Sequence, residues 1–176
     1  MWRTLKELPV RKYPRLKGYN YSQSGSYFVT FCVRDRHALL GRVVSTGDQN
    51  RSTVELTDLG IEVQQSIEYI QTDDRGVEIS KYLIMPNHVH MIITLTGCAP
   101  GIAVGHGSPT LQSLVGRIKS YTAKRWNEMC YTDHLTFWQR SFHEHIIRNK
   151  SEYLAICQYI DDNPAKWSED EYFYEL

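Results

Sequence analysis

The sequence lacks the features that define several classes of protein. No segment approaches the ~18 consecutive apolar residues of a membrane-spanning helix. The first residues, Met-Trp-Arg-Thr-Leu-Lys, lack the apolar segment of a secretory signal, so a cytoplasmic protein is expected. The four cysteines lie far apart, with no Cys-x-x-Cys pair, at Cys32, Cys98, Cys130 and Cys157. They predict reduced, incidental thiols and neither a zinc site nor a disulfide framework.

The chain also carries no net charge at pH 7, because 20 Lys and Arg residues balance 20 Asp and Glu residues. Such a chain has no general attraction to nucleic acid, and a nucleic-acid partner would have to be held by a local patch. Basic residues do gather in two places, residues 1–24 and residues 117–125, while acidic residues gather at 169–175. The zero total therefore conceals a segregated distribution of charge.

The length and composition indicate one soluble globular domain. The chain has 176 residues, of which 41% are hydrophobic and 23% charged, enough for a substantial core. We divide it into an extended basic arm (1–24), a core (25–148), a helix (149–163) and an acidic tail (164–176).

The order of expected elements defines the fold class. Strands are expected over residues 27–34, 77–84, 88–95 and 137–148, with a loop or short hairpin at 41–51. Helices are expected over 59–70 after a Thr57 or Asp58 cap, from Ser108-Pro109 onward, and from an Asn149 cap with Glu152 to about residue 162. The order βαββαβ is that of a ferredoxin-like α+β fold, a four-stranded antiparallel sheet with two helices on one face. The extra C-terminal helix would be free to cover the other face.

Two histidines stand at the start of an apolar strand. Side chains alternate along a strand, so His88 and His90 share one face, while Val89 and Met91 occupy the other. Neighbouring imidazoles on one face suit a divalent metal ion. The plainer alternative is a pair of partly exposed histidines at a strand end.

The last expected helix carries the second half of a possible site. Tyr159 and Asn163 are four residues apart and therefore share one helical face. If that face packs over His88 and His90, a metal site with two imidazoles and one amide oxygen results, with a phenol beside it. Nitrogen and amide oxygen without thiolate suit Mg²⁺ or Mn²⁺ when phosphate oxygens and water complete the shell. A phenol attacking a phosphodiester would form a covalent phosphotyrosine.

Three ordered blocks carry a resemblance to a known family. They are Met-Pro-Asn-His-Val-His (85–90), Trp-Gln-Arg-Ser-Phe-His-Glu-His-Ile-Ile-Arg-Asn (138–149) and Tyr-Ile-Asp-Asp-Asn-Pro (159–164). With them, the sequence resembles the single-tyrosine HUH transposases of small insertion sequences, and especially the REP-associated tyrosine transposase branch. The resemblance covers about residues 13–167.

This resemblance implies a metal-dependent enzyme that nicks and rejoins single-stranded DNA. His88, His90 and Asn163 would bind Mg²⁺ or Mn²⁺, and Tyr159 would take a 5′-phosphate. The implied partners are hairpin-forming DNA repeats, and relatives occur as monomers and as homodimers. A domesticated, non-catalytic binder of hairpin nucleic acid is the alternative.

Other residues compete for the same roles. Tyr153 and Tyr121 also lie on expected helices, the first as a packing residue and the second on an apolar stripe. His143 and His145 form a second His-x-His pair, interpreted as strand residues beside the site or at an edge that faces DNA. A rival interpretation joins that pair with Glu144 as the zinc site of a metal hydrolase.

Basic residues in two segments are candidates for contacts with the DNA backbone. They are Arg11, Lys12, Arg15 and Lys17 in the arm, and Arg117, Lys119 and Lys124 on the second expected helix. The alternative for the helical group is a solvated face.

Overall fold

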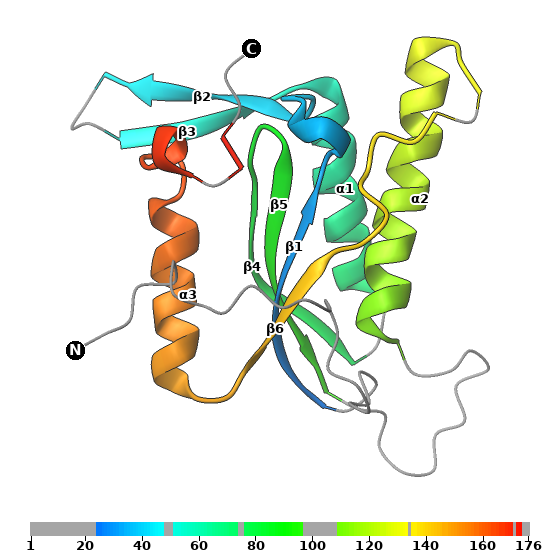
Figure 1. Ribbon diagram of the computed structural model, residues 1–176. Coiled ribbons are helices and arrows are strands. Elements are labelled where there is room, and N and C mark those ends of the chain that lie inside the picture. The colour runs from blue at the N-terminus through cyan, green and yellow to red at the C-terminus, as the bar shows by residue number, and fades with distance from the viewer. Residues whose placement is uncertain are drawn as a thin grey trace.

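The computed structural model describes residues 24–47, 51–73, 76–96, 109–133, 135–170 and 172–173. The strands are β1 (Gly25–Cys32), β2 (Gly41–Thr46), β3 (Arg51–Leu56), β4 (Val77–Ile84), β5 (His88–Leu95) and β6 (His143–Ile147). The helices are α1 (Asp58–Asp73), α2 (Leu111–Cys130) and α3 (Lys150–Asp162), with short 3-10 helices η2 (Arg34–Arg36) and η3 (Trp167–Glu169). Figure 1 shows their arrangement. Among these residues, none of the helices combines the length and apolarity that crossing a membrane requires.

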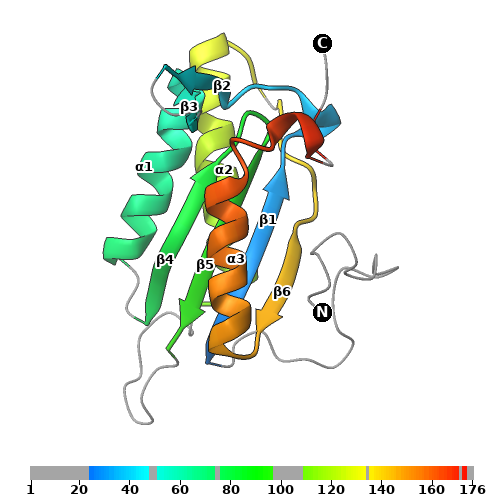
Figure 2. The same cartoon turned by 90° about the vertical axis from the view of Figure 1, so that its left-hand side faces the viewer.

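The main sheet has four strands in the order β4-β5-β1-β6, and each neighbouring pair is antiparallel. Helices α1 and α2 cover one face, and α3 crosses the other, as the two views in Figures 1 and 2 show. This arrangement confirms the predicted ferredoxin-like fold with an extra C-terminal helix. The strands β2 and β3 form a separate hairpin, longer than the short one expected.

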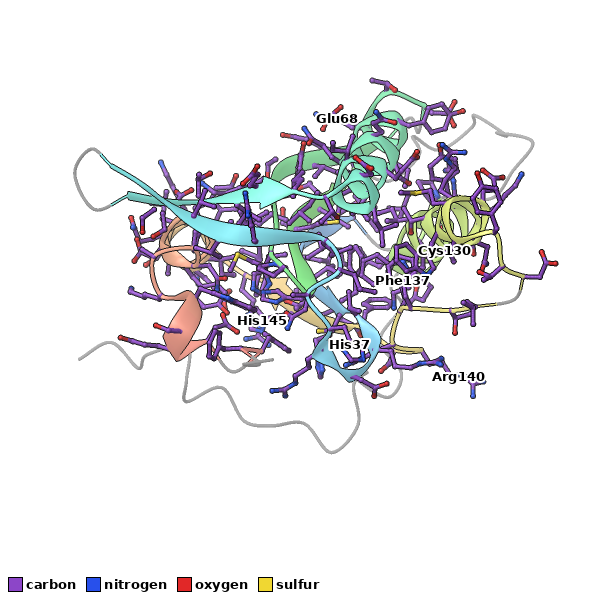
Figure 3. The ribbon with its side chains drawn as sticks, turned by 90° about the horizontal axis from the view of Figure 1, so that it is seen from above. His37, Glu68, Cys130, Phe137, Arg140 and His145 are labelled. Carbon is purple, nitrogen blue, oxygen red and sulfur yellow. The ribbon has the colours of Figure 1, made fainter. Side chains whose placement is uncertain are left out.

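Each face of the sheet has its own apolar contacts, because strand side chains alternate. The face toward α1 and α2 carries the larger core, which includes Val29, Phe31, Val89, Met91 and Ile93. The face toward α3 carries a small cluster in which Ile92 packs with Ile156 and Ile160. Seen from above, side chains fill the space on both sides of the sheet, with Phe137 beside α2 (Figure 3). His88 and His90 of β5 therefore lie on the face that α3 covers, with the smaller apolar cluster.

Two expected boundaries were wrong. The helix start at Ser108-Pro109 is replaced by a cap at Thr110, whose hydroxyl accepts from the Ser113 amide at 3.1 Å. The fourth main-sheet strand is shorter than residues 137–148, because the chain before His143 pairs only through Trp138 and Val33. The Trp138 indole instead donates to the buried Thr122 hydroxyl on α2 at 2.9 Å, a contact that local sequence patterns do not predict.

The predicted cap of α3 is confirmed and sets the direction of this helix. The Asn149 side chain accepts from the Glu152 amide at 2.9 Å. The Glu152 carboxylate accepts from the Arg148 amide at 2.7 Å and pairs with His145 of β6 at 2.7 Å. These contacts tie the first turn of α3 to the adjacent edge strand, so the helix runs back over the sheet toward the histidines of β5.

The start of α1 approaches the chain before β2 without room for a side chain. A Cβ atom added to Gly60 would lie 2.0 Å from the carbonyl oxygen of Leu40. Leu40 in turn donates its amide to Pro86, two residues before His88, at 2.9 Å. We expect Gly60→Ala to lower the free energy of unfolding by about 3 kcal/mol or more, since backbone must move to remove the clash.

Urea denaturation followed by circular dichroism measures this effect. The matched control is Gly116→Ala in α2, where an added Cβ meets nothing within 4 Å. That substitution is expected to raise stability by about 0.5–1 kcal/mol, because alanine restricts the unfolded chain. Equal stabilities of the two variants would contradict the close approach at Gly60.

Candidate metal and nucleophile site

The histidines of β5 are buried side by side beneath α3. His88 is 0% exposed and His90 is 1% exposed. Their Nε2 atoms lie 3.0 Å apart. The hairpin before them is tight, because the Met85 amide donates to the His88 carbonyl at 2.8 Å. The alternative of partly exposed histidines at a strand end therefore does not fit the structure.

Neighbouring side chains orient both imidazole rings. The Asn87 amide nitrogen donates to the carbonyls of Arg36 and Tyr172 at 2.9 and 2.8 Å, so its oxygen accepts from His88 Nδ1 at 2.9 Å. His88 Nε2 is then an acceptor with a lone pair. His90 Nδ1 is hydrogen-bonded to the Thr30 hydroxyl at 2.8 Å. Both Nδ1 atoms have partners that fix their rings, as around metal-binding histidines, and the two Nε2 atoms are hydrogen-bonded to each other.

Burial also sets the charge of the pair. It lowers the pKa of His90 to about 3. The pKa of His88 lies well below its usual value, first because of burial and then because of His90 and Arg36. Both rings are neutral at pH 7, which is the form that binds metals.

Asn163 ends α3 and contacts Asp170, whose carboxylate lies within 4.8 Å of ring nitrogens of both histidines. It is the C-cap residue of the helix and is 2% exposed. Its amide nitrogen donates to Asp170 at 2.8 Å. Its oxygen is buried and finds no hydrogen-bond donor within the part of the chain that the structure describes. A buried acceptor without a hydrogen bond lowers the free energy of unfolding by about 1–3 kcal/mol. The oxygen is therefore suited to binding a group from outside the protein, such as a metal ion.

Tyr159 lies one helical turn before Asn163, against the histidine pair. Its ring centroid is 5.3 Å from that of His90 and 6.0 Å from that of Phe28. Ile156 and Ile160 hold this part of α3 on Ile92 of β5. The structure thus packs Tyr159 against the histidine pair and links Asn163 to that pair through Asp170.

The donor set fits a divalent cation. It consists of two neutral imidazole nitrogens and an amide oxygen, without thiolate, which suits Mg²⁺ or Mn²⁺ when water and phosphate complete the coordination. Two ligands at right angles around an ion, each about 2.1 Å away, are about 3.0 Å apart. The distance between the two Nε2 atoms meets this requirement.

The segment after α3, expected as an acidic tail, packs against the site up to Phe173. The ring centroids of Tyr172 and Trp167 lie 4.6 and 5.9 Å from that of His88. Asp170, with His88 and His90, forms the one group of three potential metal-ligating side chains found in the described part of the chain. Sequence reasoning missed Asp170, Tyr172 and the orienting residues Asn87 and Thr30. The aromatic residues near the C-terminus were the available signal, but they do not specify a partner.

The second histidine pair has a different environment. His145, labelled in Figure 3, is bound to Glu152 at the start of α3. Glu144 lies opposite Val29 in the sheet, and alternation places it on the face away from its two histidine neighbours. The proposed zinc set of His143, Glu144 and His145 therefore does not share one face.

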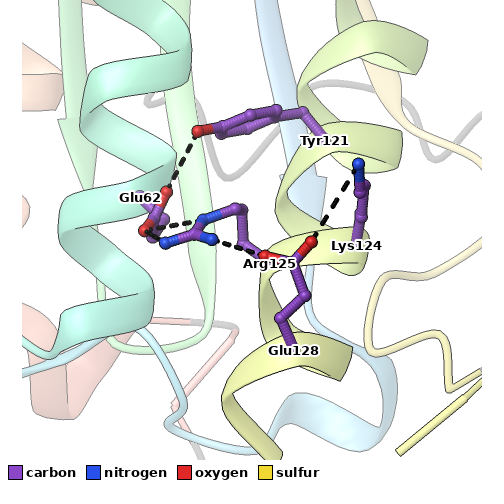
Figure 4. A network of polar contacts seen from close by, with 5 residues as sticks. All are labelled: Glu62, Tyr121, Lys124, Arg125 and Glu128. Carbon is purple, nitrogen blue, oxygen red and sulfur yellow. Dashed lines mark hydrogen bonds and ion pairs between the residues drawn. The ribbon is translucent and has the colours of Figure 1, made fainter.

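The basic residues of α2 lie across the sheet from the histidines. Arg117 pairs with Asp73 at 3.2 Å, and Lys124 with Glu128 at 4.0 Å. Figure 4 shows Lys124 in a network between α1 and α2, where Arg125 contacts Glu128 and binds another carboxylate, that of Glu62, at 2.7 Å. The competing tyrosine, Tyr121, is 45% exposed and donates to Glu62 at 3.3 Å. It does not take part in the buried stripe, where Thr122 lies instead.

The Lys119 side chain makes its contacts within the protein. Its ammonium group donates to the carbonyls of Gln139 and Ser141 at 2.9 and 2.8 Å. Burial lowers the pKa of Lys119 to about 8. These contacts hold the irregular chain before β6 against α2. The arm candidates Arg11, Lys12, Arg15 and Lys17 lie outside the described residues, as do residues 1–23 as a whole.

Comparison with known proteins identifies the family. The profile of the family described as "Transposase IS200 like" matches residues 22–163, and the chain belongs to this family of DNA-processing transposases. It is a homologue of the REP-associated tyrosine transposase of Escherichia coli K12, to which it is 27% identical over 83% of this chain and 70% of the relative. An uncharacterized protein of Haemophilus influenzae is 32% identical over 94% of both chains.

A solved structure has the same fold. It is described as "Structure of the REP associates tyrosine transposase bound to a REP hairpin". The superposition has a TM-score of 0.58 at 24% identity and covers 87% of this chain and 74% of the other. The prediction of the family from the three sequence blocks is confirmed.

Proposed function

We propose that this protein is a metal-dependent, single-strand DNA endonuclease and strand transferase that forms a 5′-phosphotyrosine intermediate. Tyr159 is the nucleophile. The observation that carries the proposal is the packing of this tyrosine against a pair of buried, neutral histidines, one helical turn from an amide oxygen that finds no donor among the described residues.

The chain supplies both the metal ligands and the nucleophile. His88, His90 and Asn163 would hold Mg²⁺ or Mn²⁺, which polarises the scissile phosphate and neutralises charge as the phosphate is attacked. The Tyr159 oxygen forms a bond to phosphorus, and the bond to the 3′-oxygen of the preceding nucleotide breaks. The phenol proton is released, and the departing oxygen takes up a proton to become a 3′-hydroxyl. Attack by a 3′-hydroxyl on the phosphotyrosine reverses the step and rejoins a strand.

The substrate we propose is DNA that contains a hairpin. The support is the relative whose structure is described as bound to a REP hairpin, together with the shared fold.

A covalent-adduct assay tests the proposal. The full chain is incubated with labelled single-stranded oligonucleotides, each carrying a hairpin repeat from the chromosomal neighbourhood of the gene, with Mg²⁺ or Mn²⁺. A labelled protein band on a denaturing gel, absent with EDTA, is the expected result. Hairpin binding without any adduct would support the non-catalytic binding protein instead.

We further propose that the seven basic residues named from the sequence contact the DNA backbone, and the outer face of α2 allows a direct test. Arg117→Glu and Lys124→Glu are expected to weaken hairpin binding and to lower the salt dependence by about one counterion per lost contact. Lys119 is a poorer test, because its substitution would also remove two internal hydrogen bonds.

Fluorescence anisotropy at several salt concentrations measures affinity and slope. Arg42→Glu is the control, because it makes the same charge change on the β2–β3 hairpin, where Arg42 pairs with Glu55 at 2.7 Å. If the wild type and the α2 variants show the same dependence of affinity on salt concentration, this face of α2 does not contact the DNA.

A further inference from the structure

Asp170 occupies a position next to the histidines that none of the sequence motifs explains. It follows the 3-10 helix η3, and its carboxylate lies within 4.8 Å of ring nitrogens of both His88 and His90. An aspartate at this distance from two buried imidazoles places a negative charge beside donor atoms that are themselves neutral.

The carboxylate is held in place by both of its oxygens. One accepts from the Asn163 amide nitrogen at 2.8 Å, and the other from the Tyr172 backbone amide at 2.7 Å. The Tyr172 carbonyl accepts from Asn87, which also orients His88. Asp170 is therefore connected by hydrogen bonds to Asn163 on one side and to His88 on the other.

These bonds leave the carboxylate able to bind a cation. An ionised carboxylate offers about four lone-pair sites, and the two hydrogen bonds occupy two of them. The bond to Asn163 also turns the nitrogen of that amide toward Asp170, and the amide oxygen has no donor among the described residues. Hard carboxylate oxygens are preferred ligands of Mg²⁺ and Mn²⁺.

We propose that Asp170 is a fourth protein ligand of the metal ion, delivered by the segment that follows α3. The inference rests on the proposed function, since it concerns the same ion. It adds the only charged ligand to the set of His88, His90 and Asn163. It also assigns a role to the segment after α3, because the same segment places Trp167 and Tyr172 against His88.

Mn²⁺ titration of the full chain without DNA tests the inference, with free Mn²⁺ measured by electron paramagnetic resonance. Asp170→Asn is expected to weaken Mn²⁺ binding by about 10-fold or more, since loss of even an outer-shell partner of a metal ligand commonly costs 10- to 100-fold. Glu169→Gln is the matched control, because it removes the same charge from the exposed neighbouring residue, and it is expected to stay within about twofold of the wild type.

The two substitutions at Asp170 separate a ligand from a positioning residue. Asparagine keeps an acceptor for the Asn163 amide, whereas Asp170→Ala removes it. If Asp170→Asn binds Mn²⁺ like Glu169→Gln and only the alanine variant is impaired, Asp170 only orients Asn163 and the inference is overturned. Thermal unfolding in EDTA verifies that each variant is folded.

One more variant distinguishes this inference from the proposed function. Mn²⁺ binding by the wild type that is lost in His88→Ala but unchanged in Asp170→Asn would overturn the role of Asp170 alone. A wild type that binds no Mn²⁺ would overturn the metal site and the proposed function with it.

Discussion

Replacing Tyr159 with phenylalanine is expected to abolish the covalent protein–DNA adduct. The phenol oxygen is the atom that forms the bond to phosphorus, and a phenyl ring has no group that can replace it. We expect the loss to be at least about 1000-fold, with hairpin affinity changed by no more than about twofold, because the lost interaction exists only during reaction. The measurement is the adduct yield on a denaturing gel, with anisotropy for binding.

A second tyrosine of the same helix provides the control. Tyr153 packs in the small cluster beneath α3, so Tyr153→Phe keeps the ring and the packing and is expected to leave the adduct yield near that of the wild type. Tyr121→Phe, on the other side of the sheet, should behave in the same way. An adduct that persists in Tyr159→Phe and disappears in either control would assign the nucleophile to that other tyrosine.

Alanine at His88 or at His90 is expected to abolish metal binding. Each ring supplies one of two nitrogens that lie 3.0 Å apart, so removing either leaves a single imidazole at the site among the described residues. We expect Mn²⁺ affinity to fall by more than about 100-fold in either variant, beyond the loss typical of an outer-shell partner. Mn²⁺ titration by electron paramagnetic resonance gives this number without requiring DNA.

The second histidine pair is the matched control for this experiment. His143→Ala and His145→Ala are expected to bind Mn²⁺ like the wild type, although His145→Ala loses its contact with Glu152 and should be less stable. If these variants lost the metal while His88→Ala retained it, the rival metal hydrolase would be correct. Circular dichroism of all four variants ensures that unfolded protein is not scored as lost binding.

Several parts of the fold could be predicted because the signals are local. The alternation in β5 separates His88 and His90 from the core residues Val89 and Met91, and burial follows that separation. The start of α3 was predictable for the same reason, since the Asn149 cap and the Glu152 amide that donates to it are three residues apart.

The errors arose where a local signal competes with a neighbouring local signal or with a distant contact. Ser108-Pro109 has the composition of a helix start, yet the capping box forms at Thr110 and Ser113. The aromatic-rich sequence before β6 resembles a strand, but Trp138 donates a hydrogen bond to Thr122 on α2 and lies outside the regular pairing. In both places, a neighbouring signal of similar strength or a tertiary hydrogen bond outweighs intrinsic propensity.

By itself, the sequence determined which side chains share a face. His88 and His90 are two residues apart on a strand, and Tyr159 and Asn163 are four apart on a helix, so backbone periodicity alone orients each pair. Only the tertiary structure decided that the two faces meet and that the rings are oriented and buried. Those properties rest on contacts such as Thr30 with His90 and Asn87 with Tyr172, separated by 60 and 85 residues. No local pattern encodes such contacts, because they form only when the sheet, α3 and the following segment have packed together.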